Sequence, residues 1–223
     1  AGCTGTLTGV AGSLSLSAAT IPVGTTCTYS ATVTGVAGGT QNNSTGLVTS
    51  TNAPNGTAAS DSVDVVAAPT VTKDFVAAAM SVGGTTTLNI TITNPAGNAV
   101  AITGSAFTDT YPVGLTGGAG TISGAGCTGT LTGIAASLTL SGATIPVGTT
   151  CTYSATITAV TAGVKNNTTS TVTSTNAATS ATANDSVTVN AVLAPVITKD
   201  FVATSIAMGG TTTLNITIQN PAG

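Results

Sequence analysis

Apolar and polar residues alternate along much of this chain. In residues 85–93 the sequence TTTLNITIT places three aliphatic side chains between Thr and Asn. Residues 137–145 (SLTLSGATI) and 150–158 (TCTYSATIT) show the same period of two. A β-strand turns successive side chains to opposite faces, and β-branched residues favour strands. These segments therefore predict half-buried β-strands.

Short segments rich in Gly, Pro and Asn separate the predicted strands and are typical of turns. Examples are residues 82–84 (VGG), 94–97 (NPAG) and 146–148 (PVG). We find no segment with an amphipathic helical pattern and end caps. Many short strands within about 120 residues favour an all-β fold. The expected architecture is an antiparallel β-sandwich of immunoglobulin-like type.

The sequence repeats itself with a period of about 125 residues, the size of a whole domain. Residues 2–36 recur as residues 126–160, and residues 71–97 recur as residues 197–223, with few substitutions in either pair. Such long internal repeats are typical of modules arranged in series.

We therefore predict three parts. Residues 1–67 are the C-terminal part of one module, residues 68–191 are a complete module, and residues 192–223 are the N-terminal part of the next. The two partial modules lack counterparts of residues 98–124, so two neighbouring chains could not complete each other cleanly. We expect the chain to belong to a longer array.

Charged residues are rare. The chain has three Lys and six acidic residues, all Asp, and a net charge of −3. Charged residues make up 4% of the chain, against roughly 25% in an ordinary domain. A nucleic-acid partner needs a basic face, so none is expected. The apolar runs fall far short of the ~18 residues of a spanning helix, so no membrane span is expected in this segment.

A surface with so little charge lacks the repulsion that keeps molecules apart. We therefore expect self-association along or between fibres. A secreted monomer with an uncharged surface is the alternative.

The four cysteines form two pairs with equal spacing. Cys3 and Cys27 lie 24 positions apart, and Cys127 and Cys151 repeat that spacing. An even count that recurs once per module predicts one disulfide in each module and an oxidising compartment outside the cytoplasm. Closing a loop of this length stabilises the fold by about 3–4 kcal/mol. The chain has no His and no CxxC pair, so neither a metal nor a cofactor is expected.

Several motifs occur in a fixed order along the whole chain. They are TKDF, VGGTTTLNITITNP, AFTDTYPVGL, GCTGT and ATIPVGTTCTYSATI. In this order they resemble the tandem repeat domains of unknown function found in bacterial and archaeal cell-surface proteins. The resemblance implies an immunoglobulin-like module strung in tandem on secreted or cell-wall proteins, and it implies no reaction. The chain departs from the family's pattern at Gln41 and Lys165, where an aromatic residue is common.

Catalysis on an external substrate is not expected. General acid and base chemistry usually uses His or paired carboxylates, and His is absent. The only acids of the complete module are Asp74, Asp109 and Asp185, all near predicted turns or strand ends, where a solvated Asp is common. We therefore predict that the protein is not an enzyme.

One intramolecular reaction is a sharper hypothesis. A Lys amine can be joined to an Asn carboxamide when a buried acid moves the protons, because an apolar core favours the neutral, nucleophilic amine. The complete module supplies Lys73 on its first strand, Asp109 in its middle and Asn167 near its end. The alternative is that Lys73 pairs with a carboxylate at the surface and Asn167 caps a turn.

Asn-x-Ser/Thr triplets make glycans a further expectation, dependent on the host. They begin at Asn43, Asn55, Asn89, Asn167 and Asn184, among others. In so Thr-rich a chain, most of these triplets are expected to arise by chance.

Structural and binding roles both fit a protein of this kind. The leading interpretation is a structural, non-catalytic repeat of an extracellular fibre, stalk or cell-surface filament. The alternative is an adhesin module that binds a carbohydrate or a host protein, with Phe107 and Tyr111 as the best candidates for exposed aromatic contacts. Ice binding is disfavoured, because it needs a short repeat.

Overall fold

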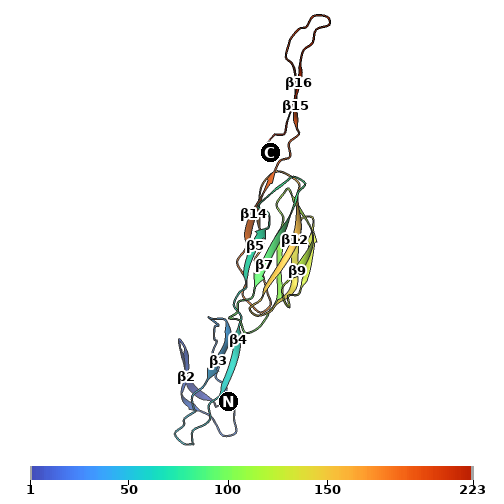
Figure 1. The fold of residues 1–223 in the computed structure, drawn as a ribbon. Helices are drawn as coiled ribbons and strands as arrows, with labels where there is room; N and C mark the ends of the chain where they lie inside the picture. Colours follow the sequence, from blue (N-terminus) through green and yellow to red (C-terminus); the bar gives the residue numbers. More distant parts are fainter. Residues whose placement is uncertain (1, 222–223) are drawn as a thin grey trace. The chain divides into compact units, whose positions relative to one another are not determined.

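The computed structural model describes residues 2–221 (Figure 1). These residues form sixteen β-strands and no helix, so the all-β prediction is confirmed. No helix with the length and apolar character of a membrane span occurs in residues 2–221. The chain divides into two units, residues 1–36 and residues 37–223, which are described in turn.

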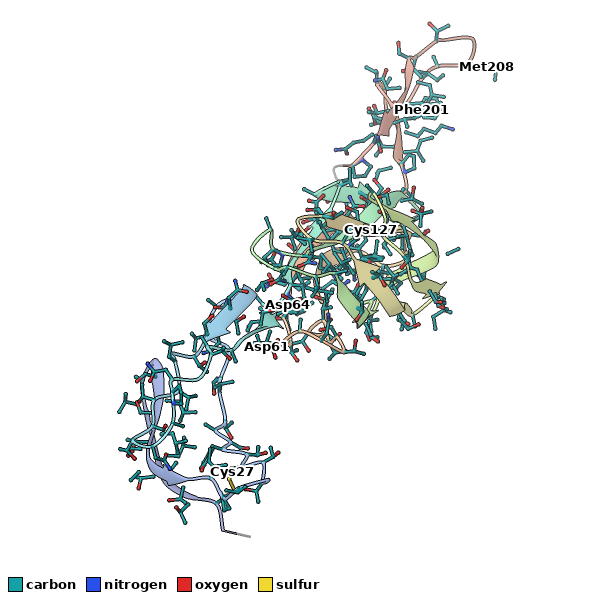
Figure 2. The ribbon with its side chains drawn as sticks, turned by 90° about the horizontal axis from the view of Figure 1, so that it is seen from below. Cys27, Asp61, Asp64, Cys127, Phe201 and Met208 are labelled. Atoms are coloured by element: carbon teal, nitrogen blue, oxygen red, sulfur yellow. A yellow bond between two sulfur atoms is a disulfide. The ribbon has the colours of Figure 1, made fainter. Side chains whose placement is uncertain are left out.

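The first unit is built around one β-hairpin. Strand β1 (Thr4–Val10) pairs antiparallel with β2 (Ser13–Thr20). The turn between them uses Gly12, whose φ of +85° lies in the left-handed region that Gly adopts without steric cost. A disulfide joins Cys3, next to β1, to Cys27 in the segment that follows β2 (Figure 2).

Most of the second unit is a β-sandwich formed by residues 70–190. Its strands are β5 (Thr70–Phe75), β6 (Ala79–Ser81), β7 (Thr85–Thr93), β8 (Ile102–Thr110), β9 (Leu115–Ser123), β10 (Thr130–Ile134), β11 (Ser137–Ile145), β12 (Thr150–Ala159), β13 (Gly163–Thr168) and β14 (Asn184–Asn190). They form three sheets, in the orders β5-β7-β12-β9, β10-β11-β8 and β13-β14-β6.

All but one of the strand pairs in the described residues are antiparallel. The exception is β6 with β14, which run parallel with Thr188 opposite Ala79. The expectation of a purely antiparallel sandwich is therefore wrong at this edge. A parallel pair needs a long connection, and here most of the sandwich lies between the two strands in sequence.

The core is formed by the inward faces of the alternating strands. The predicted strands at 85–93, 137–145 and 150–158 are confirmed as β7, β11 and β12. The ring of Tyr153 on β12 meets that of Phe107 on β8 edge to face, with centroids 5.8 Å apart. Full burial of each large aliphatic side chain contributes about 1.5–3 kcal/mol. The largest apolar side chains that are fully buried are Tyr153, Leu88, Ile90, Ile92, Ile102, Leu138, Leu140, Ile145, Ile157, Val172 and Val187.

A buried pair of amides fixes the turn after β7. Asn94 donates from Nδ2 to the carbonyls of Val100 and Ile145, at 3.2 and 2.9 Å. Asn98 donates to Asn94 Oδ1 at 2.7 Å and to the carbonyl of Ala67 at 3.1 Å, and it accepts the N–H of Ala67 at 2.7 Å. These bonds attach the segment before β5 to the turn.

Two further hairpins repeat pairs seen inside the sandwich. Strands β3 (Gly39–Ser44) and β4 (Ser60–Val65) pair in the register of β13 and β14. Strands β15 (Val196–Phe201) and β16 (Leu214–Gln219) pair in the register of β5 and β7. The repeated sequence therefore specifies the same local pairing each time.

Aromatic residues outside the sandwich are less buried than their repeat mates inside it. Phe75 on β5 is 4% exposed, whereas its repeat mate Phe201 on β15 is 53% exposed. Figure 2 shows Phe201 beside the strands of its hairpin. Tyr29 is half-buried, whereas its mate Tyr153 is fully buried. Aromatic residues at matching repeat positions are therefore core residues only in the sandwich, where other sheets cover the strands.

Candidate functional site

Three polar side chains occupy inward-facing positions in the core of the sandwich. Lys73 on β5 faces inward two residues before Phe75. Asp109 on β8 faces inward two residues after Phe107. Asn167 faces inward on β13. Alternation normally places apolar residues at such positions, so three polar groups there form an unusual cluster.

The carboxylate of Asp109 lies between the other two side chains. Lys73 Nζ donates to Asp109 Oδ1 in a short ion pair, and neither side chain has any exposed surface. Asn167 Nδ2 donates to Asp109 Oδ2 at 2.8 Å. One carboxylate thus contacts both an amine and a carboxamide away from solvent.

One polar atom of this cluster, Asn167 Oδ1, is buried and has no hydrogen-bond partner among the described residues. An unpaired buried polar atom costs about 1–3 kcal/mol. The hydrogen bonds of the cluster are therefore incomplete in this state, and Oδ1 of Asn167 can still accept one.

Burial controls the ionisation of the cluster. Desolvation lowers the pKa of Lys73 from its ordinary value of 10.5, and it outweighs the hydrogen bond and charge of Asp109 and the charge of Asp185, which act in the opposite direction. Desolvation also raises the pKa of Tyr111 to about 12, and the charge of Asp109 adds to that effect. The surroundings thus make the neutral amine of Lys73 easier to form than in water, and a neutral amine is a nucleophile.

Asp185 supports the cluster in a way that the sequence analysis missed. It lies on β14 directly opposite Asn167 on β13, and its Oδ2 accepts the backbone N–H of Phe75 at 2.6 Å. It therefore ties β5 to β14. A sequence signal was available, because Asp61 holds the same position opposite Asn43 in the other repeat.

The expectation of a solvated Asp near a strand end is wrong for Asp109, which is fully buried on β8. The alternative of a surface ion pair for Lys73 and a turn cap for Asn167 is also wrong, because both side chains are buried on strands. The signal that could have identified them is the alternation itself: Lys73 stands two residues from Phe75, at a position of the inward face.

A shallow polar depression of about 280 Å³ borders the strand that carries Asn167. It is lined by Asn166, Asn167, Thr168, Asn184, Asp185 and Ser186.

Among the described residues, such a cluster of Lys, Asp and Asn side chains forms only in the sandwich. The repeat mate of Lys73 is Lys199, which is exposed on β15 with its Nζ 5.6 Å from the ring centroid of Phe201. The repeat mate of Asn167 is Asn43, which is exposed on β3.

Both predicted cysteine pairs are bonded in the structure. Cys127, before β10, is joined to Cys151 on β12, with Cα atoms 5.7 Å apart. The bond from Cys3 to Cys27 has a similar Cα separation of 5.8 Å. Cys151 is fully buried and belongs to the sandwich core.

Other candidate residues lie elsewhere than expected. Phe107 and Tyr111 are buried core residues and not exposed aromatic contacts, so that part of the adhesin alternative is wrong. Asn167 is only 2% exposed, which rules out a glycan on its side chain in the folded state. No group of three or more Asp, Glu, His or Cys that could hold a metal ion occurs within residues 2–221.

Comparison with known proteins identifies a family. The model of a domain of unknown function, DUF7933, matches residues 1–65 and 69–189. None of the curated proteins matches the chain.

Solved structures show weak likeness. A non-cellulosomal cohesin from the archaeon Archaeoglobus fulgidus is 12% identical, with a TM-score of 0.40 over 55% of this chain and 91% of that one. The pilus backbone RrgB of Streptococcus pneumoniae is 15% identical, with a TM-score of 0.37 over 48% of this chain and only 31% of its own length. The C-terminal domain of the antigen I/II-family protein AspA of Streptococcus pyogenes is 12% identical, with a TM-score of 0.38 over 61% of this chain and 50% of that one. Likeness at this level does not extend to function.

Proposed function

We propose that this chain, which belongs to the DUF7933 family of domains of unknown function, is a non-catalytic structural repeat of an extracellular or cell-surface fibre or stalk. Immunoglobulin-like modules would follow one another along it. The observation that carries the proposal is the near-identity of residues 2–36 with residues 126–160, and of residues 71–97 with residues 197–223. A spacer needs equivalent units in series, whereas a single binding site does not.

The covalent bonds support an extracellular location. Each repeat has a disulfide at the same place, between Cys3 and Cys27 and between Cys127 and Cys151. Such bonds persist outside the reducing cytoplasm. A bond within each module would keep that module folded independently of its neighbours.

The surface chemistry supports packing between chains. Charged residues make up 4% of the sequence, so contacts between copies encounter little like-charge repulsion. The polar surface comes mainly from Thr, Ser, Asn and Gly. We expect association to be lateral or end to end, without nucleic acid as a partner.

The test is electron microscopy of the surface of cells that make the protein, with gold-labelled antibodies raised against residues 68–191. We expect gold particles in rows along extended fibres or stalks. Antibodies against an unrelated cytoplasmic protein serve as the control. Label confined to the cell interior, or scattered soluble particles with no fibre, would contradict the proposal.

A further inference from the structure

The cluster of Lys73, Asp109 and Asn167 has the three groups that an amide-forming reaction needs. It holds an amine, a carboxamide and an acid in direct contact, with the acid in the middle. All three side chains are buried in the sandwich. Both reactants are therefore held against the same carboxylate, which removes part of the entropic cost of bringing them together.

We propose that Lys73 and Asn167 become joined by an intramolecular isopeptide bond, with Asp109 as the catalytic acid and base. The bond links Nζ of Lys73 to Cγ of Asn167 and releases one ammonia. It connects β5, the first strand of the sandwich, to β13 near its end.

The first step makes the nucleophile and activates the carbonyl. A proton passes from the Lys73 ammonium to the Asp109 carboxylate along their hydrogen bond, which leaves a neutral amine and a neutral acid. The O–H of Asp109 then donates to Oδ1 of Asn167. The Nζ lone pair attacks Cγ and forms the new C–N bond, while the carbonyl π electrons move to Oδ1, which takes the proton from Asp109.

The second step expels ammonia. The Asp109 carboxylate accepts a proton from the positively charged Nζ and transfers it to Nδ2. The bond from Cγ to Nδ2 breaks and ammonia leaves. The carbonyl re-forms, and the proton on its oxygen returns to Asp109. An amine and a primary amide have become a secondary amide and ammonia, and Asp109 keeps the proton that Lys73 gave up. The reaction needs no oxidant and no other reactant.

The unpaired Oδ1 of Asn167 is consistent with this mechanism. With Asp109 ionised, Nδ2 of Asn167 donates to it and Oδ1 has no partner. A half-turn of the amide exchanges its two ends. Once Asp109 carries a proton, Oδ1 can face it and accept its O–H, so protonation of Asp109 turns the resting arrangement into the reactive one.

Burial also favours the product. Two opposite charges in a core require desolvation that their attraction compensates only in part. In the product, the amide and the protonated Asp109 are both neutral, so the buried charges disappear. The ammonia is released beside the polar depression that borders Asn167.

The experiment is the intact mass of the full chain after reduction of its disulfides. We expect the chain to be lighter than its sequence by one ammonia. The same deficit can arise when an exposed Asn closes to a succinimide, for example at Asn55 before Gly56, so three variants separate the two reactions. Lys73→Met, Asp109→Asn and Asn167→Leu are each expected to restore the full mass, whereas a succinimide would persist in Lys73→Met.

Two exposed residues outside the cluster provide matched controls. Asn166→Ala, next to Asn167 on β13, and Lys199→Ala, the repeat mate of Lys73, should keep the ammonia deficit.

Digestion of the denatured, reduced chain with trypsin gives a readout that does not require the variants to fold. The chain has three Lys and no other tryptic site. Cleavage should fail after Lys73 and succeed after Lys165 and Lys199, so residues 1–165 and 166–199 should be recovered as one branched product.

An unmodified wild-type mass, or free cleavage after Lys73, would overturn the isopeptide. Neither result would affect the fibre proposal, which rests on the repeats. Failure to find fibres would likewise leave the isopeptide unaffected.

Discussion

The disulfide from Cys127 to Cys151 should contribute a defined share of the stability of the sandwich. Its two cysteines lie 24 positions apart in the chain. Closing a loop of that length removes conformational entropy from the unfolded chain and is worth about 3.5 kcal/mol at 25 °C. Reduction of the bond changes no side chain other than the two sulfurs, so it isolates this contribution from core packing.

The expected change in melting temperature follows from the size of the sandwich. For about 120 residues, the entropy of unfolding is about 0.25 kcal/mol/K. A loss of about 3.5 kcal/mol therefore lowers the melting temperature by about 14 °C. Calorimetry of the full chain, oxidised and fully reduced, measures this shift, and the near-ultraviolet circular dichroism of Tyr111 and Tyr153 reports on the same transition.

The first unit supplies the matched control. The bond from Cys3 to Cys27 has the same spacing but lies outside the sandwich. Cys3→Ala with Cys27→Ala should leave the sandwich transition within about 2 °C of the wild type, whereas Cys127→Ala with Cys151→Ala should reproduce the effect of reduction. If the double substitution of Cys127 and Cys151 lowers the free energy of unfolding by less than about 1 kcal/mol, the entropy argument fails. The hairpin of β10 and β11 would then already close this loop in the unfolded chain.

Three further outcomes follow from the structure. In an Asn167→Leu background, which cannot form the isopeptide, adding Asp109→Ala should destabilise the sandwich by about 3–5 kcal/mol in urea unfolding, because it leaves Lys73 buried without a counter-charge. In the same background, Lys73→Met combined with Asp109→Leu should recover most of the loss; equal losses in the two variants would refute this. Stability should fall as pH rises above 10.0, the ordinary Tyr pKa, towards 12, since burial raises the pKa values of Tyr111 and Tyr153 to about 12 and only the unfolded chain ionises in that window. Each of the two contributes a slope of about 1.4 kcal/mol per pH unit, so denaturant titrations of Tyr153→Phe should show a fall about half as steep. Gly133→Ala should lower the stability of the sandwich by about 1–3 kcal/mol, because the new Cβ would lie 1.9 Å from the carbonyl oxygen of Gly118. Gly118→Ala places its Cβ where no atom lies within 4 Å and should be nearly neutral, so similar melting temperatures for the two variants would contradict the predicted clash.

Individual strands and hairpins could be predicted from the sequence, because the alternation of apolar and polar residues within each segment determines them. The alternation in residues 85–93 places each side chain on one face without reference to the rest of the fold, and β7 has those bounds. Hairpin registers are equally local, which is why β15 and β16 repeat the pairing of β5 and β7.

Non-local contacts could not be predicted in the same way. The parallel pairing of β6 with β14 joins segments about a hundred residues apart, and no turn or period encodes it. Lys73 and Asp109 are 36 positions apart, and Asp109 and Asn167 are 58 apart. The residue types suggested a chemistry, but only the packing of three strands could show that the groups meet. Burial of Phe107 and Tyr111 depends on the same packing.

The positions of Lys73 and Asn167 determine how the sandwich would respond to a pulling force. β5 is its first strand, and β13 and β14 are its last two. Asp109 contacts Lys73 and Asn167 together, and Asp185 holds Phe75 of β5 to β14. A load applied across residues 70–190 would pass through these contacts before it reached β7 to β12. The strands between would stay folded while this link held, and an isopeptide between Lys73 and Asn167 would hold it beyond the load that breaks the ion pair. The extensibility of the domain thus depends on a few atoms near its two ends.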